Sequence, residues 1–149
     1  MNKNEKINPV LFWTLSLTWG LPLTLLGFAI AVFLMIFGYK PRRFHCMIRF
    51  EIGEGWGGFS LGGFMFTSEN PTLHVKQHEA GHGIQNTVFG VFMPFIVSIP
   101  SMIRYWYREY MTKVKKKKEL PPYDSIWFEG QATDLGEKFF PSDDYTCEA

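Results

Sequence analysis

The sequence predicts an α+β fold: an N-terminal transmembrane helix, a β-hairpin, and a helical core in which a helix with two histidines packs on a C-terminal helix with a glutamate. The first supporting observation is the uncharged, mostly apolar run over residues 7–39. The second is the alternation from Phe44 to Ile52, in which every second residue is apolar. The third is the motif His78-Glu79-Ala80-Gly81-His82, because two histidines four residues apart share one face of a helix.

The N-terminal run is long enough to cross a bilayer once, with Leu11 to Phe37 as the anchor. A hydrocarbon core of about 30 Å needs about 20 apolar residues of helix. Gly20-Leu21-Pro22 leaves too little chain for two crossings and indicates a kink. The run is longer than a signal-peptide core and lacks a cleavage site, so we expect it to be retained. More cations follow it than precede it, which favours a cytoplasmic location for the remainder.

Residues 40–140 are expected to form a minimal metal-binding domain, and residues 141–149 a flexible tail. The net charge of +1 gives no argument for nucleic acid, and none is expected as a partner. Cys46 and Cys147 lie far apart, which excludes a disulfide framework and a Cys-x-x-Cys metal site. With 46% hydrophobic and 17% aromatic residues, the composition is heavy for a soluble domain.

Two extended segments open this domain. Phe44 to Ile52 reads as a half-buried strand, the glycine-rich stretch 53–58 as a turn, and Phe59 to Thr67 as a second strand, so we expect a hairpin. Gly62-Gly63 within the second strand indicates a bulge or the close approach of another backbone. That backbone is either a peptide along the strand edge or the adjacent helix.

The motif helix is expected to begin near Pro71 or Thr72. His78 and His82 are candidate ligands of Zn²⁺, which takes histidine nitrogens at about 2.0–2.1 Å and keeps a position for water. Glu79 is the candidate general base that takes the proton of this water. His74 is interpreted as solvated or as a neighbour of the ligands, because catalytic zinc normally has three protein ligands. A structural histidine pair is the alternative.

A last helix from Ile126 to Phe140 supplies the third ligand, with Asp124 or Ser125 as its cap. One side of this helix is apolar or small except for a carboxylate, which is costly unless it is paired or binds a cation. This side contains Ile126, Glu129, Ala132, Thr133, Gly136 and Phe140. Glu129 is therefore the expected metal ligand, and the small residues allow a close approach to the helix with Gly81 and Gly83.

Residues 88–103 form a second apolar stretch, and Gly90, Pro94 and Pro100 argue against an unbroken spanning helix there. We expect this stretch to lie on the bilayer or dip into it, with a core segment as the alternative. The basic run Lys113 to Lys118 suits anionic lipid headgroups. A solvated surface and, more weakly, nucleic-acid binding are the alternatives for this run.

The residues resemble the gluzincin type of zinc metallopeptidase, in which a second helix supplies a glutamate ligand. The likeness rests on His-Glu-x-x-His and on Glu129-x-x-Ala132-x-x-Leu135-Gly136, and it covers residues 74–138. The sequence is also similar to small, uncharacterised bacterial membrane proteins with His-Glu-x-Gly-His. The resemblance implies a zincin-like core with zinc on His78, His82 and Glu129. Gluzincins often have an aspartate where this chain has Thr133, and Asp134 is the reserve ligand.

These observations predict a membrane-anchored zinc-dependent hydrolase, most directly a metallopeptidase acting on an undefined peptide or protein. The candidate oxyanion donors, which the sequence does not rank, are Tyr105, Tyr107, Tyr123 and His74. The main alternative is a non-enzymatic membrane protein in which the metal is a structural staple closed by His74 or Asp134. A third hypothesis is an interaction module recruited by the lysine run.

Overall fold

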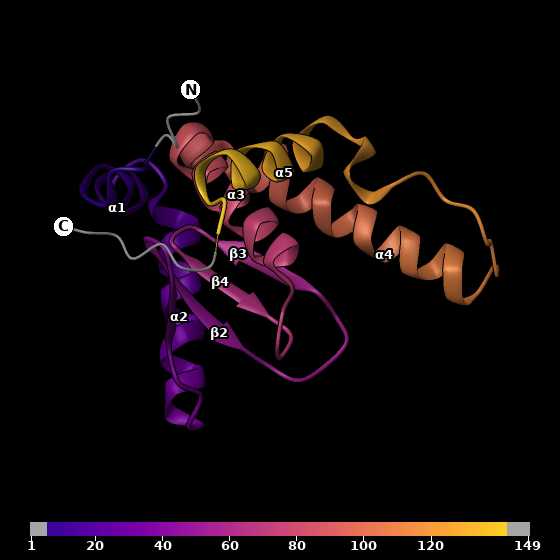
Figure 1. Cartoon of the computed structure of the whole chain (residues 1–149), viewed down its shortest axis with the longest axis horizontal. Coiled ribbons are helices and arrows are strands. Elements are labelled where there is room, and N and C mark those ends of the chain that lie inside the picture. Colours follow the sequence, from indigo (N-terminus) through magenta and orange to yellow (C-terminus); the bar gives the residue numbers. More distant parts are fainter. Residues whose placement is uncertain (1–5, 143–149) are drawn as a thin grey trace.

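Residues 6–142 are described by a computed structural model, in which a small mixed sheet lies between helices (Figure 1). The fold is α+β, as predicted. The helices are α1 (Pro9–Leu17), α2 (Leu21–Ile36), α3 (Leu73–Phe89), α4 (Ile99–Lys113) and α5 (Trp127–Phe139). The strands are β1 (Arg42–Phe44), β2 (Met47–Glu51), β3 (Gly58–Leu61) and β4 (Phe64–Thr67).

The prediction of a single hairpin was wrong. The chain instead forms two tight antiparallel hairpins, β1 with β2 and β3 with β4, and β1 begins two residues before the expected first strand. The two hairpins join through β2 and β4, which run parallel with Ile48 opposite Phe64, so the strand order is β1-β2-β4-β3. The first turn contains His45 at φ +52°, within a segment whose alternation gives no sign of a turn. At the second, Gly62 has φ +62°, which glycine adopts without strain.

The two faces of the sheet pack on different helices. Phe50, Phe64 and Phe66 form a cluster with Ala31 and Leu34 of α2. Met47 and Met65 point the other way and pack with Ala80 of α3. The sheet therefore separates α2 from α3, and α5 packs on α3 in turn.

The expected transmembrane segment is not one helix, because α1 and α2 meet at 97°. No described helix is long and apolar enough to cross a membrane alone, although two bent pairs pass by length and composition together: α1 with α2, and Leu73–Phe92 with Pro94–Lys113. The break at Gly20 falls where α3 passes, since a Cβ there would lie 2.2 Å from Asn86 Nδ2. The kink expected at Gly20-Leu21-Pro22 is thus a sharp corner.

The start of α3 is as predicted, since the Thr72 hydroxyl accepts a hydrogen bond from the Val75 N–H. The expected cap of α5 was wrong: Ile126 holds that position, and no side chain caps the helix. Ser125 instead accepts a hydrogen bond from Arg104 of α4, at 2.9 Å. The loop before α5 is therefore held by α4.

Glycines set the spacing of α3 and α5, as expected. A Cβ on Gly81 would lie 1.8 Å from the Ala132 carbonyl oxygen, and one on Gly136 would lie 2.0 Å from that of Gln77. Gly83, predicted for the same contact, faces the sheet instead, where a Cβ would meet Met47 Cε at 2.6 Å. Backbone thus packs directly on backbone between these two helices.

The apolar stretch 88–103 is broken, as its glycine and prolines predict. After α3 the chain passes through a 3₁₀ turn (Gly90–Phe92) and a π-helical turn (Pro94–Ser98) before α4. The chain bends by 116° at the break between Leu73–Phe92 and Pro94–Lys113. None of the α4 residues is buried, and the helix projects from the body before the chain returns toward α5 (Figure 1).

Candidate metal centre

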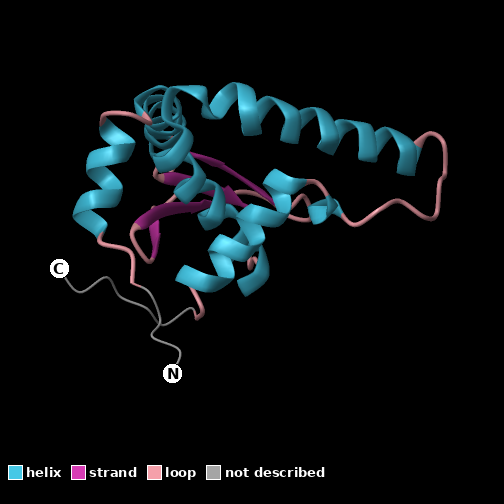
Figure 2. Cartoon of the chain, turned by 90° about the horizontal axis from the view of Figure 1, so that it is seen from above, coloured by secondary structure: helices cyan, strands magenta, loops and turns pink. Residues whose placement is uncertain are grey.

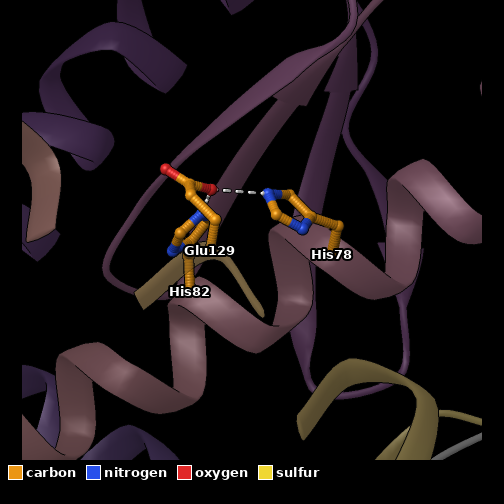
Figure 3. Close-up of side chains that lie close together, drawn as sticks. All are labelled: His78, His82 and Glu129. Atoms are coloured by element: carbon orange, nitrogen blue, oxygen red, sulfur yellow. Dashed lines mark hydrogen bonds and ion pairs between the residues drawn. The ribbon is translucent and has the colours of Figure 1, made fainter. Parts of the chain in front are cut away.

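Three predicted ligands converge where α3 meets α5. His78 Nε2 lies 3.1 Å and His82 Nε2 lies 3.2 Å from Glu129 Oε2. Figure 3 shows both rings directed at the carboxylate. One ligand atom from each residue lies within 4.8 Å of the others. A tetrahedral ion with bonds of about 2.0–2.1 Å sets its ligand atoms about 3.3 Å apart, so the spacing suits one ion.

The chemistry of the group also fits a cation. Glu129 has no exposed surface, and its Oε1 has no hydrogen-bond partner among the described residues. A buried carboxylate oxygen without a partner is costly, and a bound ion removes that cost. Within residues 6–142 this is the one cluster of at least three potential ligands with such spacing. The group can therefore hold a metal ion.

The other ring nitrogens are fixed by hydrogen bonds. His78 Nδ1 lies 2.9 Å from Thr133 Oγ1, and His82 Nδ1 lies 2.8 Å from Gln85 Oε1. Gln85 is itself held, because its Nε2 donates to the Phe128 carbonyl and to Gln131. When Nδ1–H donates a hydrogen bond, Nε2 keeps the lone pair that a metal needs. Thr133, a departure from the gluzincin pattern, thus sits where it orients a ligand.

Glu79 lies beside the ligand group and against the edge strand β3. Its side chain is buried, and the Ser60 hydroxyl contacts both Glu79 Oε2 at 3.0 Å and the Glu79 carbonyl oxygen at 2.7 Å. A Cβ on Gly58 would lie 3.0 Å from Glu79 Oε1, so glycine gives this carboxylate room. Burial raises the pKa of Glu79, although the charges of His82 and His78 oppose the shift. A carboxylate with a raised pKa suits a general base.

The charges of the ligand group are coupled. Burial disfavours the ionised form of Glu129, but hydrogen bonds from His78 and His82 outweigh it and hold its pKa at about 2. Burial also disfavours protonation of His82, yet the hydrogen bond that the ring donates to Glu129 and the charge of Glu79 raise its pKa. In the metal-free protein a proton on His82 therefore supplies part of the positive charge that a bound cation would bring to Glu129.

A tyrosine and a serine complete the surroundings. The Tyr123 ring lies 6.2 Å from that of His78, and its hydroxyl lies 3.2 Å from Ser101 Oγ. Arg104 donates to the Tyr123 carbonyl at 3.0 Å, which ties the loop to α4. Burial raises the pKa of Tyr123, so its hydroxyl stays protonated and able to donate. Ser101 and Arg104 were not among the predicted site residues, because they lie far from the motif in the chain.

The remaining sequence candidates are not brought to the centre. His74 is exposed and lies 3.8 Å from Glu137. Asp134 is exposed and does not join the ligand cluster. Tyr105 and Tyr107 are exposed on α4. Among the four candidate oxyanion donors, only Tyr123 has a ring contact with a histidine of the described centre.

Comparison of this chain with protein families, with curated proteins and with solved structures finds no match in any of the three. The resemblance to gluzincins therefore rests on the motif residues alone.

Proposed function

We propose that this chain is a membrane-associated zinc-dependent hydrolase, and more narrowly a metallopeptidase. The observation that carries the proposal is the position of Glu79: a buried carboxylate next to a His-His-Glu group, held by Ser60 and left out of the group itself. A staple between two helices has no use for this residue. Two histidines and one carboxylate are a ligand set of catalytic zinc sites.

The residues divide the chemistry among them. A bound zinc ion would supply a Lewis acid and lower the pKa of a water molecule. Glu79 accepts the proton of that water and passes it to the leaving amine. The Tyr123 hydroxyl, protonated and carried on a ring 6.2 Å from that of His78, donates a hydrogen bond to the developing oxyanion. Thr133 and Gln85 hold the two rings in the tautomer that leaves Nε2 free.

The alternative is a structural metal that fastens α3 to α5. Such sites are usually closed by a fourth protein ligand. The sequence offers His74 and Asp134 for this position, and both are exposed away from the cluster. The three potential ligands found among the described residues, without a fourth, therefore favour the catalytic hypothesis.

Replacement of Glu79 separates the two functions. In Glu79→Gln we expect hydrolysis of a broad peptide mixture to fall by about 10²–10⁴-fold, the usual contribution of a general base. Zinc content, measured on the purified protein, should stay at the wild-type value, because Glu79 is not one of the ligands. Glu54→Gln, on an exposed turn, is the control. Zinc-loaded wild type that cleaves no peptide, or Glu79→Gln with full activity, would refute the proposal.

A further inference from the structure

Two helices on one side of the molecule turn apolar side chains outward. On α2 these include Leu25, Phe28, Phe33 and Ile36, with Phe33 59% and Ile36 75% exposed. On α4 they include Ile103, Trp106, Tyr107 and Tyr110, with Trp106 64% exposed. Apolar surface on this scale marks a contact with another molecule or with lipid.

Both outward faces point the same way. The inner face of α2 packs on the sheet, which leaves its apolar face on the far side. The polar side of α4 is turned to the loop before α5, since Arg104 and Arg108 donate to carbonyls of Pro122 and Pro121. Figure 2 shows α2, seen along its axis, and the long α4 along one edge of the molecule, with the sheet and α5 on the other side.

The connecting segment makes this surface continuous. Met93 and Val97 are buried against Leu23 of α2, which fixes the start of α4 beside that helix. In the same segment, Phe92 and Phe95 are 55% and 70% exposed. The apolar surface thus passes from α2 through residues 91–96 to α4 without interruption by a charged residue in that segment.

We propose that α2, residues 91–96 and α4 form one membrane-binding face, and that both helices lie in the plane of a single leaflet. The packing of α2 opposes a crossing. Leu23, Gly27, Ala31 and Leu34, spread along the whole helix, are buried in the body. A crossing would carry the sheet into the hydrocarbon, where open sheet edges do not occur. The 16 residues of α2 also span only about 24 Å, less than the core of about 30 Å.

The aromatic and cationic residues on and beside this face identify lipid as the partner that covers it. Trp106, Tyr107 and Tyr110 on the apolar side of α4 are residue types that settle at the headgroup level. Lys115 to Lys118 are exposed just beyond α4, and Arg42 and Arg43 are exposed just beyond α2. An apolar face with cations at its ends is the composition of a helix that lies in an anionic interface. This inference does not depend on the hydrolase proposal, because its tests measure vesicle binding and the insertion depth of α2.

Vesicle flotation tests the face. We expect the full chain to bind vesicles of phosphatidylcholine with phosphatidylserine more tightly than phosphatidylcholine alone. Phe33→Gln and Trp106→Gln should each weaken binding roughly tenfold. Thr112→Gln, a change at an exposed position on the polar side of α4, should leave vesicle binding unchanged.

The lysines are tested by a variant in which all four residues from Lys115 to Lys118 are replaced by glutamine. This variant should bind more weakly only to the anionic vesicles, by about fivefold per lysine. Equal binding by all variants would overturn the proposal, as would loss of self-association with vesicle binding intact, which would mark a second copy as the occupant.

The bilayer depth of positions along α2 distinguishes a helix that lies in one leaflet from a helix that crosses the membrane. Leu25, Val32 and Ile36 share its outer face, and a spin label can replace each one in a chain with Cys147→Ser and the buried Cys46 retained. In-plane binding predicts equal depth for the three labels. A crossing helix would instead separate the labels at positions 25 and 36 by about 16 Å in depth, and that result would overturn the proposal.

Discussion

The helix pairs α3–α5 and α2–α4 distribute polarity in opposite ways. Between α3 and α5, polar side chains lie inside: Gln77, His82, Gln85 and Glu129 are all buried. On α2 and α4, large apolar side chains lie outside. The first pair encloses its charges and the second exposes its hydrophobic surface.

The difference shows what each pair requires from its surroundings. The buried polar groups of α3 and α5 satisfy one another, and the atom left over, Glu129 Oε1, points to a cation. The exposed apolar groups of α2 and α4 have no such internal solution and point to an apolar environment outside. On the two proposals, a metal would complete one region and a lipid leaflet the other, and each can be removed separately.

The largest expected effect comes from Glu129. In Glu129→Ala the centre loses one of three ligands, and we expect zinc affinity to fall by roughly two to three orders of magnitude. Asp134→Ala, on the same helix but exposed, is the matched control and should bind zinc as the wild type does. Titration of both purified variants with a competing chelator measures this. Stoichiometric zinc in Glu129→Ala with loss in Asp134→Ala would reassign the ligand.

The close contact of α3 and α5 is tested by two glycines on one helix. Gly81→Ala places a Cβ on the Ala132 backbone, so we expect it to destabilise the fold by about 3 kcal/mol or more. In Gly83→Ala the close contact is with the flexible end of Met47, the Gly62 carbonyl oxygen being at an ordinary 3.4 Å, and the gain of about 1 kcal/mol in helix propensity offsets much of that cost. Urea unfolding of the metal-free proteins measures both. A smaller loss in Gly81→Ala than in Gly83→Ala would contradict the packing described here.

The sequence predicted which three side chains meet, but not the sheet beside them. His78, His82 and Glu129 were identified because helical spacing and one carboxylate on an apolar face are local signals. The supporting contacts of Ser60, Ser101 and Tyr123 depend on how distant segments meet, and no spacing encodes that. The two short hairpins were missed because the turn at His45 interrupts no alternation, and the parallel pairing of β2 with β4 is a long-range choice.

Thr133 tests whether the rings are positioned from outside the ligand group. Thr133→Val keeps the shape but removes the hydroxyl next to His78 Nδ1, so we expect zinc affinity to fall by about 10–100-fold. Thr133→Ser restores the oxygen and should recover most of it. The same chelator titration applies. Wild-type affinity in Thr133→Val would show that His78 is oriented without this contact.

Protons should compete with the metal. The raised pKa of His82 means that this ring holds a proton which zinc must displace, whereas Glu129, with a pKa of about 2, is already ionised. Zinc affinity should therefore fall as the pH drops through the pKa of His82, by about tenfold per unit for each proton displaced. Calorimetry in buffers of different ionisation enthalpy counts the protons released. An affinity that is constant between pH 7 and about 5.5 would contradict this.

The smallest effect is expected at His74, one turn before His78 on the same helix. It lies outside the polar interior, in an exposed pair with Glu137 at 3.8 Å. Exposed pairs contribute little, so His74→Ala should change the free energy of unfolding by less than about 0.5 kcal/mol. Zinc affinity should stay within about twofold of wild type, since no ligand is lost. A clear loss of zinc would bring His74 into the coordination sphere, close the open position, and favour a structural staple over a hydrolase.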